Sequence, residues 1–304
     1  MYALEIKGLK KTYSNGVEAL KGIDLSVKAG DFFALLGANG AGKSTTIGLV
    51  ATLIQKTAGH IEIYGRNLER ETTHAKRLLG LVPQEININI FEKCEQVLLN
   101  QAGYYGLSRH SVIERANTLL KQLGLWDKRL HQVRQLSGGM KRRLMIARAL
   151  IHDPRILILD EPTAGVDVEI RRTIWDFLET INAAGTTIIL TTHYLEEAER
   201  LCKNIAIINH GQIIQNTSMR SLLDSLSHQT YVFNTLTPIT TLPDVIASMA
   251  EIIDTHTFEL RLNHQHTLND IFSHLTQHHI TVHHVNNKIN RLEALYMDLI
   301  HHAD

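Results

Sequence analysis

A glycine-rich segment at residues 37–45, Gly-Ala-Asn-Gly-Ala-Gly-Lys-Ser-Thr, fits the phosphate-loop pattern G-x-x-x-x-G-K-[ST]. It lies between the apolar runs 31–37 and 44–54, which predict a buried strand and a helix. Glycines let the backbone curl so that its N–H groups and the helix N-terminus face phosphate oxygens. We expect Lys43 to reach the β- and γ-phosphates of a nucleotide and Ser44 to ligate Mg²⁺. The residues expected to bind the nucleotide here are Gly37, Asn39, Gly40, Ala41, Gly42, Lys43, Ser44 and Thr45.

Two acidic residues, Asp160 and Glu161, end the apolar run 155–162. Hydrolysis of a nucleotide needs one acid to hold the water shell of a metal ion and a second carboxylate to polarise the attacking water. Two acids after a strand are by themselves more typical of a helix-capping turn. The phosphate loop favours the catalytic interpretation, with Asp160 serving the metal and Glu161 the water.

A second phosphate-binding pattern lies about a hundred residues downstream, in LSGGMKRRLMIARAL at 136–150. Two adjacent glycines open a predicted helix with basic residues in its first turns, and a positive helix end attracts phosphate. One nucleotide needs only one such cradle. Without companion motifs, LSGG would be an ordinary capped helix start.

The motifs together resemble the ATP-binding cassette (ABC) family. They are the phosphate loop, Gln84 in LVPQE, LSGGM, ILILDEPT, the turn AGVD and His193 in TTHYLEEAE, in that family's order, and the resemblance covers roughly Leu4 to Met219. It implies a two-lobed ATPase with ATP and Mg²⁺ as cofactors. It also implies a homodimer in which two copies stack head to tail and sandwich two ATP molecules.

The resemblance assigns the second cradle to the opposite subunit. Ser137, Gly138 and Gly139 would bind the γ-phosphate that the partner's phosphate loop holds, and Asp167 would link the two sites across the dimer. ATP would then close the dimer, and hydrolysis would let it open.

The remaining roles are also implied by resemblance. Tyr13 matches the residue that stacks on adenine, although a lone tyrosine in an early strand is more often a packing residue. Gln84 matches the residue that touches both the metal region and the coupling segment. His193 matches the switch histidine that contacts the γ-phosphate. The expected catalytic residues are Lys43, Gln84, Glu161 and His193, and the expected metal ligands are Ser44, Gln84 and Asp160.

The sequence predicts an α/β fold: a P-loop NTPase (RecA-like) core with an antiparallel β subdomain and a helical subdomain. Strand patterns at 4–13, 23–30 and 59–65 predict the antiparallel part, and helical periodicity alone covers about 90–152. The nucleotide-binding domain is expected to span 1–222. After it, 227–304 predicts a small α/β accessory domain, with strands at 257–263 and 280–285 and helices at 268–279 and 289–300. Its position suggests a role in regulating the ATPase or strengthening the dimer.

Composition limits the partners. Lys plus Arg and Asp plus Glu both total 31, so net charge gives no argument for nucleic acid. No targeting segment is expected in the charged start of the chain, and the longest apolar runs fall short of the roughly 20 residues that span a bilayer.

Cys94 and Cys202 are expected to be packing residues. Ten of the 18 histidines lie between His256 and His302; without CxxC or HExxH companions they favour solvated side chains over a metal site.

Two departures from the commonest family motifs, Met140 in the signature and AGVD as the turn, are similar to exporter ATPases encoded apart from their membrane subunit. We therefore expect the ATPase of an exporter at the cytoplasmic face of the membrane, with a separate multi-span permease docking near 85–106. Within that segment, Phe91 fits either the docking surface or the core. The alternative is a soluble, non-transport ABC ATPase acting on ribosomes or DNA, and a small-molecule kinase has no use for LSGG.

Overall fold

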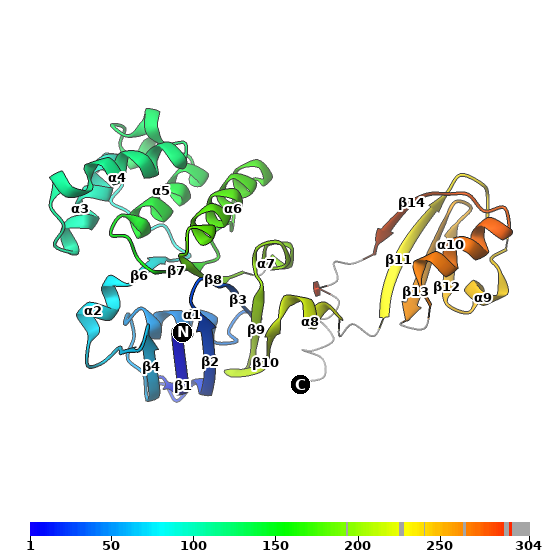
Figure 1. Ribbon diagram of the computed structural model, residues 1–304, viewed down its shortest axis with the longest axis horizontal. Coiled ribbons are helices and arrows are strands. Elements are labelled where there is room, and N and C mark those ends of the chain that lie inside the picture. Colours follow the sequence, from blue (N-terminus) through cyan, green and yellow to red (C-terminus); the bar gives the residue numbers. More distant parts are fainter. Residues whose placement is uncertain (193, 225–227, 240, 264–265, 289–291, 294–304) are drawn as a thin grey trace. The chain divides into compact units, whose positions relative to one another are not determined.

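The computed structural model describes residues 1–304 except 193, 225–227, 240, 264–265, 289–291 and 294–304 (Figure 1). The chain divides into two compact units, 1–219 and 220–304, which are described one at a time. Among the described residues, no helix combines the length and apolar character needed to cross a bilayer.

A six-stranded sheet forms the centre of the first unit. Its order is β10 (Gln212–Ser218), β9 (Asn204–Asn209), β3 (Phe32–Leu36), β8 (Thr187–Thr191), β7 (Ile156–Asp160) and β6 (Leu79–Val82). All neighbours are parallel except β9 and β10, which form an antiparallel hairpin that turns at His210 and Gly211. Every residue of β3, β7 and β8 is buried, as expected for apolar runs in a sheet covered on both faces.

The predicted antiparallel sheet is also present. Its order is β2 (Glu18–Lys28), β1 (Tyr2–Thr12), β4 (Ala58–Ile63) and β5 (Arg66–Asn67). Burial alternates along these strands, so that one face is apolar. That face shares one hydrophobic core with α1 (Lys43–Val50) and with apolar side chains of the central sheet such as Phe33 and Ile158.

The predicted helical region, 91–152, is described throughout and contains helices, turns and one isolated antiparallel bridge between Lys93 and Gln132, with no strand. After α2 (Thr72–Arg77), it holds α3 (Cys94–Tyr104), α4 (Arg109–Gln122), the 3-10 turns η1 (Trp126–Lys128) and η2 (Val133–Gln135), and α5 (Gly138–Leu150). Figure 1 shows α3, α4 and α5 grouped together, away from the antiparallel sheet. Phe91, at the start of this region, is exposed and carries the Arg134 guanidinium over its ring, so of its two alternatives the core is excluded.

The central strands bring distant motifs to one edge of the sheet. Because β3, β7 and β8 are parallel, their carboxyl ends lie on the same side, where open α/β sheets bind ligands. The loops that leave these ends carry the phosphate loop, the acid pair and the segment around 192–194. Two helices then follow, α6 (Val168–Ala183) and α7 (Leu195–Leu201).

The second unit is a four-stranded antiparallel sheet with helices in β-α-β-β-α-β order. After α8 (Met219–Asp224), it contains β11 (His228–Thr235), α9 (Asp244–Ala247), β12 (Ala250–Asp254), β13 (Thr257–Asn263), α10 (Leu268–Gln277) and β14 (Val282–Asn287). The strand order β12-β13-β11-β14 is that of a ferredoxin-like fold. Its core includes Phe233 and Phe258, stacked with centroids 4.8 Å apart.

Three elements of this unit match the sequence prediction, and three were missed. The expected strands β13 and β14 and helix α10 are present, whereas β11, α9 and β12 were not predicted. Most of the predicted closing helix, 289–300, lies outside the described residues.

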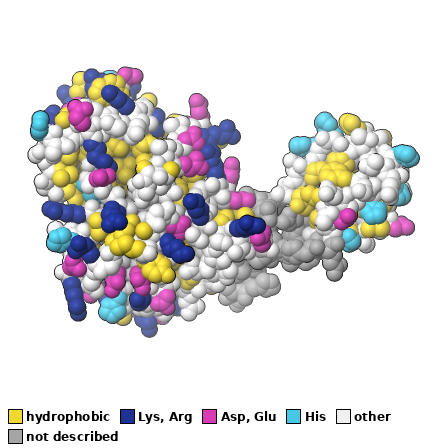
Figure 2. Space-filling view, in the orientation of Figure 1, with side chains coloured by type: hydrophobic (Ala, Val, Ile, Leu, Met, Phe, Trp, Pro, Cys, Tyr) yellow, Lys and Arg dark blue, Asp and Glu magenta, His cyan; other side chains and the backbone are white. Residues whose placement is uncertain are grey.

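On the face in Figure 2, histidines lie around the rim of a hydrophobic centre in this unit. His256, His278, His279, His283 and His284 are exposed, and no metal-binding group of three or more ligands occurs among the described residues.

Candidate functional site

The phosphate loop opens onto a small cavity of about 140 Å³. Six of the eight phosphate-loop residues expected to bind nucleotide meet there, together with Gln84 and Glu161, which follow strands β6 and β7 of the central sheet. The cavity is lined by Asn39, Gly40, Gly42, Lys43, Ser44, Thr45, Gln84 and Glu161.

Two glycines in the loop have no substitute that fits the backbone. Gly42 has a φ of +116°, and a Cβ on it would lie 3.0 Å from the Ala19 carbonyl oxygen. A Cβ on Gly37 would lie 2.4 Å from the Ile208 carbonyl oxygen, closer than atoms can approach. The backbone of the loop therefore packs against β2 and β9 too closely for any side chain at these two positions, and only glycine fits there.

Lys43, at the start of α1, is only 6% exposed. Its Nζ donates to the carbonyl oxygens of Gly37 (2.7 Å) and Ala38 (3.0 Å), so the ammonium group lies over the loop. Burial lowers the pKa of Lys43, and the charges of Glu161 and Asp160 oppose that shift. The cation is thus held between the loop and the acid pair.

The acid pair has a different environment at each carboxylate. Asp160 ends β7 and accepts a hydrogen bond from the Thr191 hydroxyl on β8. Glu161 adopts a left-handed backbone with φ 49°, and its N–H donates to the Thr191 carbonyl at 3.0 Å. The two carboxylates therefore differ in their hydrogen-bond partners, with Thr191 at Asp160 and Gln84 at Glu161. The Gln84 side chain donates through Nε2 to Glu161 Oε2 at 3.1 Å, so residues 77 positions apart meet at the site.

The aromatic residue expected at the adenine lies close to the phosphate loop. The Tyr13 hydroxyl is 3.3 Å from the Thr45 Oγ1, and the Lys11 ammonium lies 4.9 Å from the centre of the tyrosine ring. Tyr13 is exposed, which excludes the alternative that it is a core packing residue.

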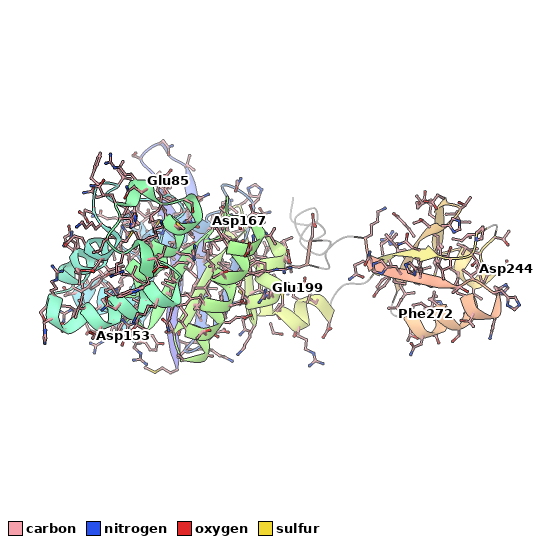
Figure 3. All side chains as sticks on the ribbon, turned by 90° about the horizontal axis from the view of Figure 1, so that it is seen from above. Glu85, Asp153, Asp167, Glu199, Asp244 and Phe272 are labelled. Carbon is pink, nitrogen blue, oxygen red and sulfur yellow. The ribbon has the colours of Figure 1, made fainter. Side chains whose placement is uncertain are left out.

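The signature residues do not line the cavity. Ser137 caps α5, because its Oγ accepts from the Met140 N–H at 3.3 Å. Ser137 and Gly138 are exposed, whereas Gly139 is buried against Ile170 of α6. Asp167, labelled in Figure 3, is exposed and caps α6 by accepting from the Ile170 N–H at 2.9 Å. Both caps present helix N-termini at the surface of a single chain.

His193 lies outside the described residues. Its expected role therefore stays a prediction, and only its sequence neighbours can be placed.

Sequence reasoning missed one buried cation that connects two motifs. Arg142, on α5, donates to the carbonyl oxygens of Pro83 (2.8 Å) and Gln84 (2.7 Å). Burial lowers the pKa of its guanidinium, while the charges of Asp160 and Glu161 raise it. The only signal in the sequence was the group of basic residues after LSGG, which suggested phosphate contact and not a contact to the Gln84 loop.

Comparison with known proteins agrees with this geometry. The family model described as ABC transporter matches residues 20–164. The linearmycin resistance ATP-binding protein LnrL of Bacillus subtilis is 35% identical over 304 residues, covering 97% of each chain. The Nod factor export ATP-binding protein I of Cupriavidus metallidurans is 40% identical over 222 residues, covering 73% of each chain.

Solved structures give the same result. A structure of an ATP-binding subunit of an ABC transporter is 30% identical, with a TM-score of 0.67, over 73% of this chain and 92% of that one. The dimeric post-hydrolysis state of the ATP-binding cassette MJ0796, bound to ADP and Pi, is 29% identical, with a TM-score of 0.66, over 71% of this chain and 99% of that one.

The fold and the site define a P-loop ATPase that binds ATP. The chain belongs to the ABC transporter family, and within it the chain is an ATP-binding subunit of the exporter kind. This confirms the family predicted from the sequence and favours the exporter over a soluble ATPase acting on ribosomes or DNA. ATP-binding domains of this family dimerise and work with membrane permeases.

Proposed function

We propose that two copies of this chain form an ATP-dependent homodimer that drives a separately encoded export permease from the cytoplasmic face of the membrane. The proposal rests on one observation: the two phosphate-binding motifs of a single chain do not meet in one cavity. The cavity holds the phosphate loop and Glu161, while Ser137 and Gly138 are exposed outside it. A helix N-terminus with solvent-facing N–H groups fits the γ-phosphate of a nucleotide held by a second copy.

Within one chain, each group at the cavity has a distinct role. Lys43 neutralises the phosphates, and Glu161 positions and polarises the attacking water, held in place by the hydrogen bond from Gln84. The oxygen donors of Ser44, Asp160 and Gln84 suit Mg²⁺, which prefers hydroxyl, carboxylate and amide oxygens. When bound, Mg²⁺ would neutralise charge on the phosphate oxygens.

Arg142 supports communication between the nucleotide and the helical region. It joins α5, whose N-terminus carries the signature, to the backbone of Gln84, whose side chain contacts Glu161. A change in the hydrogen bonding of Glu161 therefore reaches α5 through a short series of direct contacts.

A groove of about 710 Å³ beside the helical region is the docking site that we propose for the permease. Its walls combine exposed apolar and aromatic side chains with basic ones, and part of them comes from 85–106, the segment where the family resemblance predicts docking. The residues that give it this character include Leu53, Lys76, Arg77, Tyr104, Arg148 and His152. Such a surface fits an amphipathic cytoplasmic segment of a membrane protein.

The substitution Glu161→Gln tests the site. The amide keeps the size of the side chain but cannot act as a base, so hydrolysis should fall by roughly 10² to 10⁴ fold while ATP binding persists. Adding ATP should then accumulate a dimer, measured by light scattering on the purified chain. Glu85→Gln is the matched control, because Glu85, labelled in Figure 3, is exposed and is not among the residues that line the cavity. Near-parental hydrolysis by Glu161→Gln would show that another group activates the water.

A further inference from the structure

A buried carboxylate behind the nucleotide cavity joins three segments of the chain. Glu197, on α7, is fully buried, and its Oε1 accepts hydrogen bonds from Thr163 Oγ1 (2.9 Å) and Trp175 Nε1 (2.8 Å). Thr163 follows Glu161 by two residues, and Trp175 lies in the middle of α6. One oxygen atom therefore connects the loop after the catalytic acid with both following helices.

Further contacts fasten α6 to α7 on either side of this carboxylate. The Arg171 guanidinium lies 4.4 Å from the centre of the Tyr194 ring, and Tyr194 is the residue that follows position 193. At the other end of α7, Arg200 pairs with Asp176 of α6 at 2.8 Å. Helix α7 is therefore fixed along its length to α6, whose N-cap is the exposed Asp167.

A carboxylate at this position is costly, which argues for a specific geometry. Burial raises the pKa of Glu197, and interactions with Thr192, Trp175, Thr163 and Arg171 act against that shift. An apolar side chain would fill the space without a desolvation cost, but it could not accept two hydrogen bonds. The two hydrogen bonds at Oε1 are directional, so they fix the side chain of Glu197 relative to Thr163 and Trp175.

We propose that Glu197 is a positioning residue that fixes the Glu161–Asp167 loop relative to Tyr194 and the start of α7. Glu197 does not line the nucleotide cavity, so it acts through Thr163, α6 and the start of α7. The elements that it joins include the exposed Asp167 turn, which in the proposed dimer faces the second copy. Loss of the carboxylate should therefore impair dimer closure and turnover but not the binding of nucleotide to one chain. This inference rests on the proposed function.

The test measures binding, dimerisation and turnover separately on the full-length chain. In the Glu161→Gln background, Glu197→Ala should reduce the ATP-dependent dimer at least fivefold by light scattering. The affinity of the single chain for a fluorescent ATP analogue should stay within about twofold. With Glu161 intact, Glu197→Ala should lower kcat about tenfold or more and leave KM nearly unchanged. Glu197→Gln keeps an acceptor oxygen and should restore most of both properties. Glu196→Ala, on the exposed neighbour, is the matched control.

Two gentler variants keep the test decisive if Glu197→Ala does not fold. Trp175→Phe and Thr163→Val each remove one donor and leave Glu197 in place, and each should lower kcat and the dimer fraction in part. Normal dimerisation and kcat in these variants, or equal losses of kcat and nucleotide affinity, would overturn the inference. If Glu161→Gln alone forms no dimer with ATP, the proposed function fails. If Glu161→Gln dimerises and the double variant with Glu197→Ala dimerises equally well, only the role of Glu197 fails.

Discussion

His152 is predicted to make the stability of the first unit depend on pH. Its ring stacks on Tyr105 with centroids 3.6 Å apart and planes inclined by 3°. Its Nε2 lies 3.0 Å from the Leu79 carbonyl oxygen, so the neutral ring donates there, while Nδ1 is buried with no hydrogen-bond partner among the described residues. Burial lowers the pKa of His152 to about 4, and the charge of Arg115 also lowers it, against the Leu79 hydrogen bond and Asp153.

The size and sign of the effect follow from that pKa. The pKa is 6.5 in the unfolded chain and about 4 in the folded one, which at about 1.4 kcal/mol per pH unit corresponds to about 3 kcal/mol. Because the ring is partly exposed, solvent screening reduces this to roughly 2 kcal/mol. The unfolded chain binds the proton more readily, so the stabilisation is complete above pH 6.5. It is lost as pH falls from 6.5 towards 4.

The variant His152→Phe isolates this contribution, because phenylalanine keeps the stacked ring and cannot titrate. Its stability relative to the parent, from urea unfolding of the first unit, should improve by roughly 2 kcal/mol between pH 7 and pH 4.5. The control is His110→Phe, which replaces an exposed histidine in α4. A plot of its free energy of unfolding against pH should run parallel to that of the parent. The same His152→Phe variant also assigns the His152 signal in a histidine-labelled NMR titration. If that signal titrates near pH 6.5, or the stability difference is flat with pH, the reasoning is refuted.

Two further substitutions test the nucleotide site. Gly42→Ala should weaken ATP binding at least tenfold and destabilise the chain by about 1 to 3 kcal/mol, because its Cβ would strike Leu20 and the Ala19 carbonyl at a positive φ. In Gly40→Ala the added Cβ meets no atom within 4 Å, so this variant should lose less stability when thermal unfolding of the two variants is compared. Ser137→Arg places a bulky side chain at an exposed helix end, so a single chain should bind the ATP analogue normally while ATP-dependent dimerisation is lost. A normal dimer would contradict binding of γ-phosphate across the interface.

The strands of the first unit were predictable because their sequences leave few choices. Runs such as 156–159 are apolar throughout, as is typical of a strand buried on both faces of a sheet. In the second unit, β11 mixes polar residues with apolar ones and leads into a loop rich in Thr and Pro, and β12 exposes Ile252 and Ile253 as well as Glu251 and Asp254. Their pairing with β13 supplies the order that local sequence does not specify.

The parts of the site that are formed by neighbouring residues in the sequence could be predicted, whereas the contacts between residues far apart in the sequence could not. The phosphate loop and the acid pair follow from short motifs. Arg142 and Glu197 were missed because their partners, Gln84 and Thr163, lie 58 and 34 residues away, and no spacing rule connects them. The exposure of Ser137 likewise depends on how α5 packs, which the motif LSGG does not contain.

The single core shared by the antiparallel sheet, α1 and the central sheet has a genetic consequence. Apolar residues such as Ile6 and Ile63 do not line the nucleotide cavity, yet they belong to the same cluster as Ile47 of α1. Weakening them would lower the fraction of folded chains and, with it, the number of working phosphate loops. Screens for loss of export should therefore return temperature-sensitive alleles in the antiparallel sheet. Such alleles should be suppressed by stabilising changes elsewhere in this core, whereas alleles of Glu161 should not.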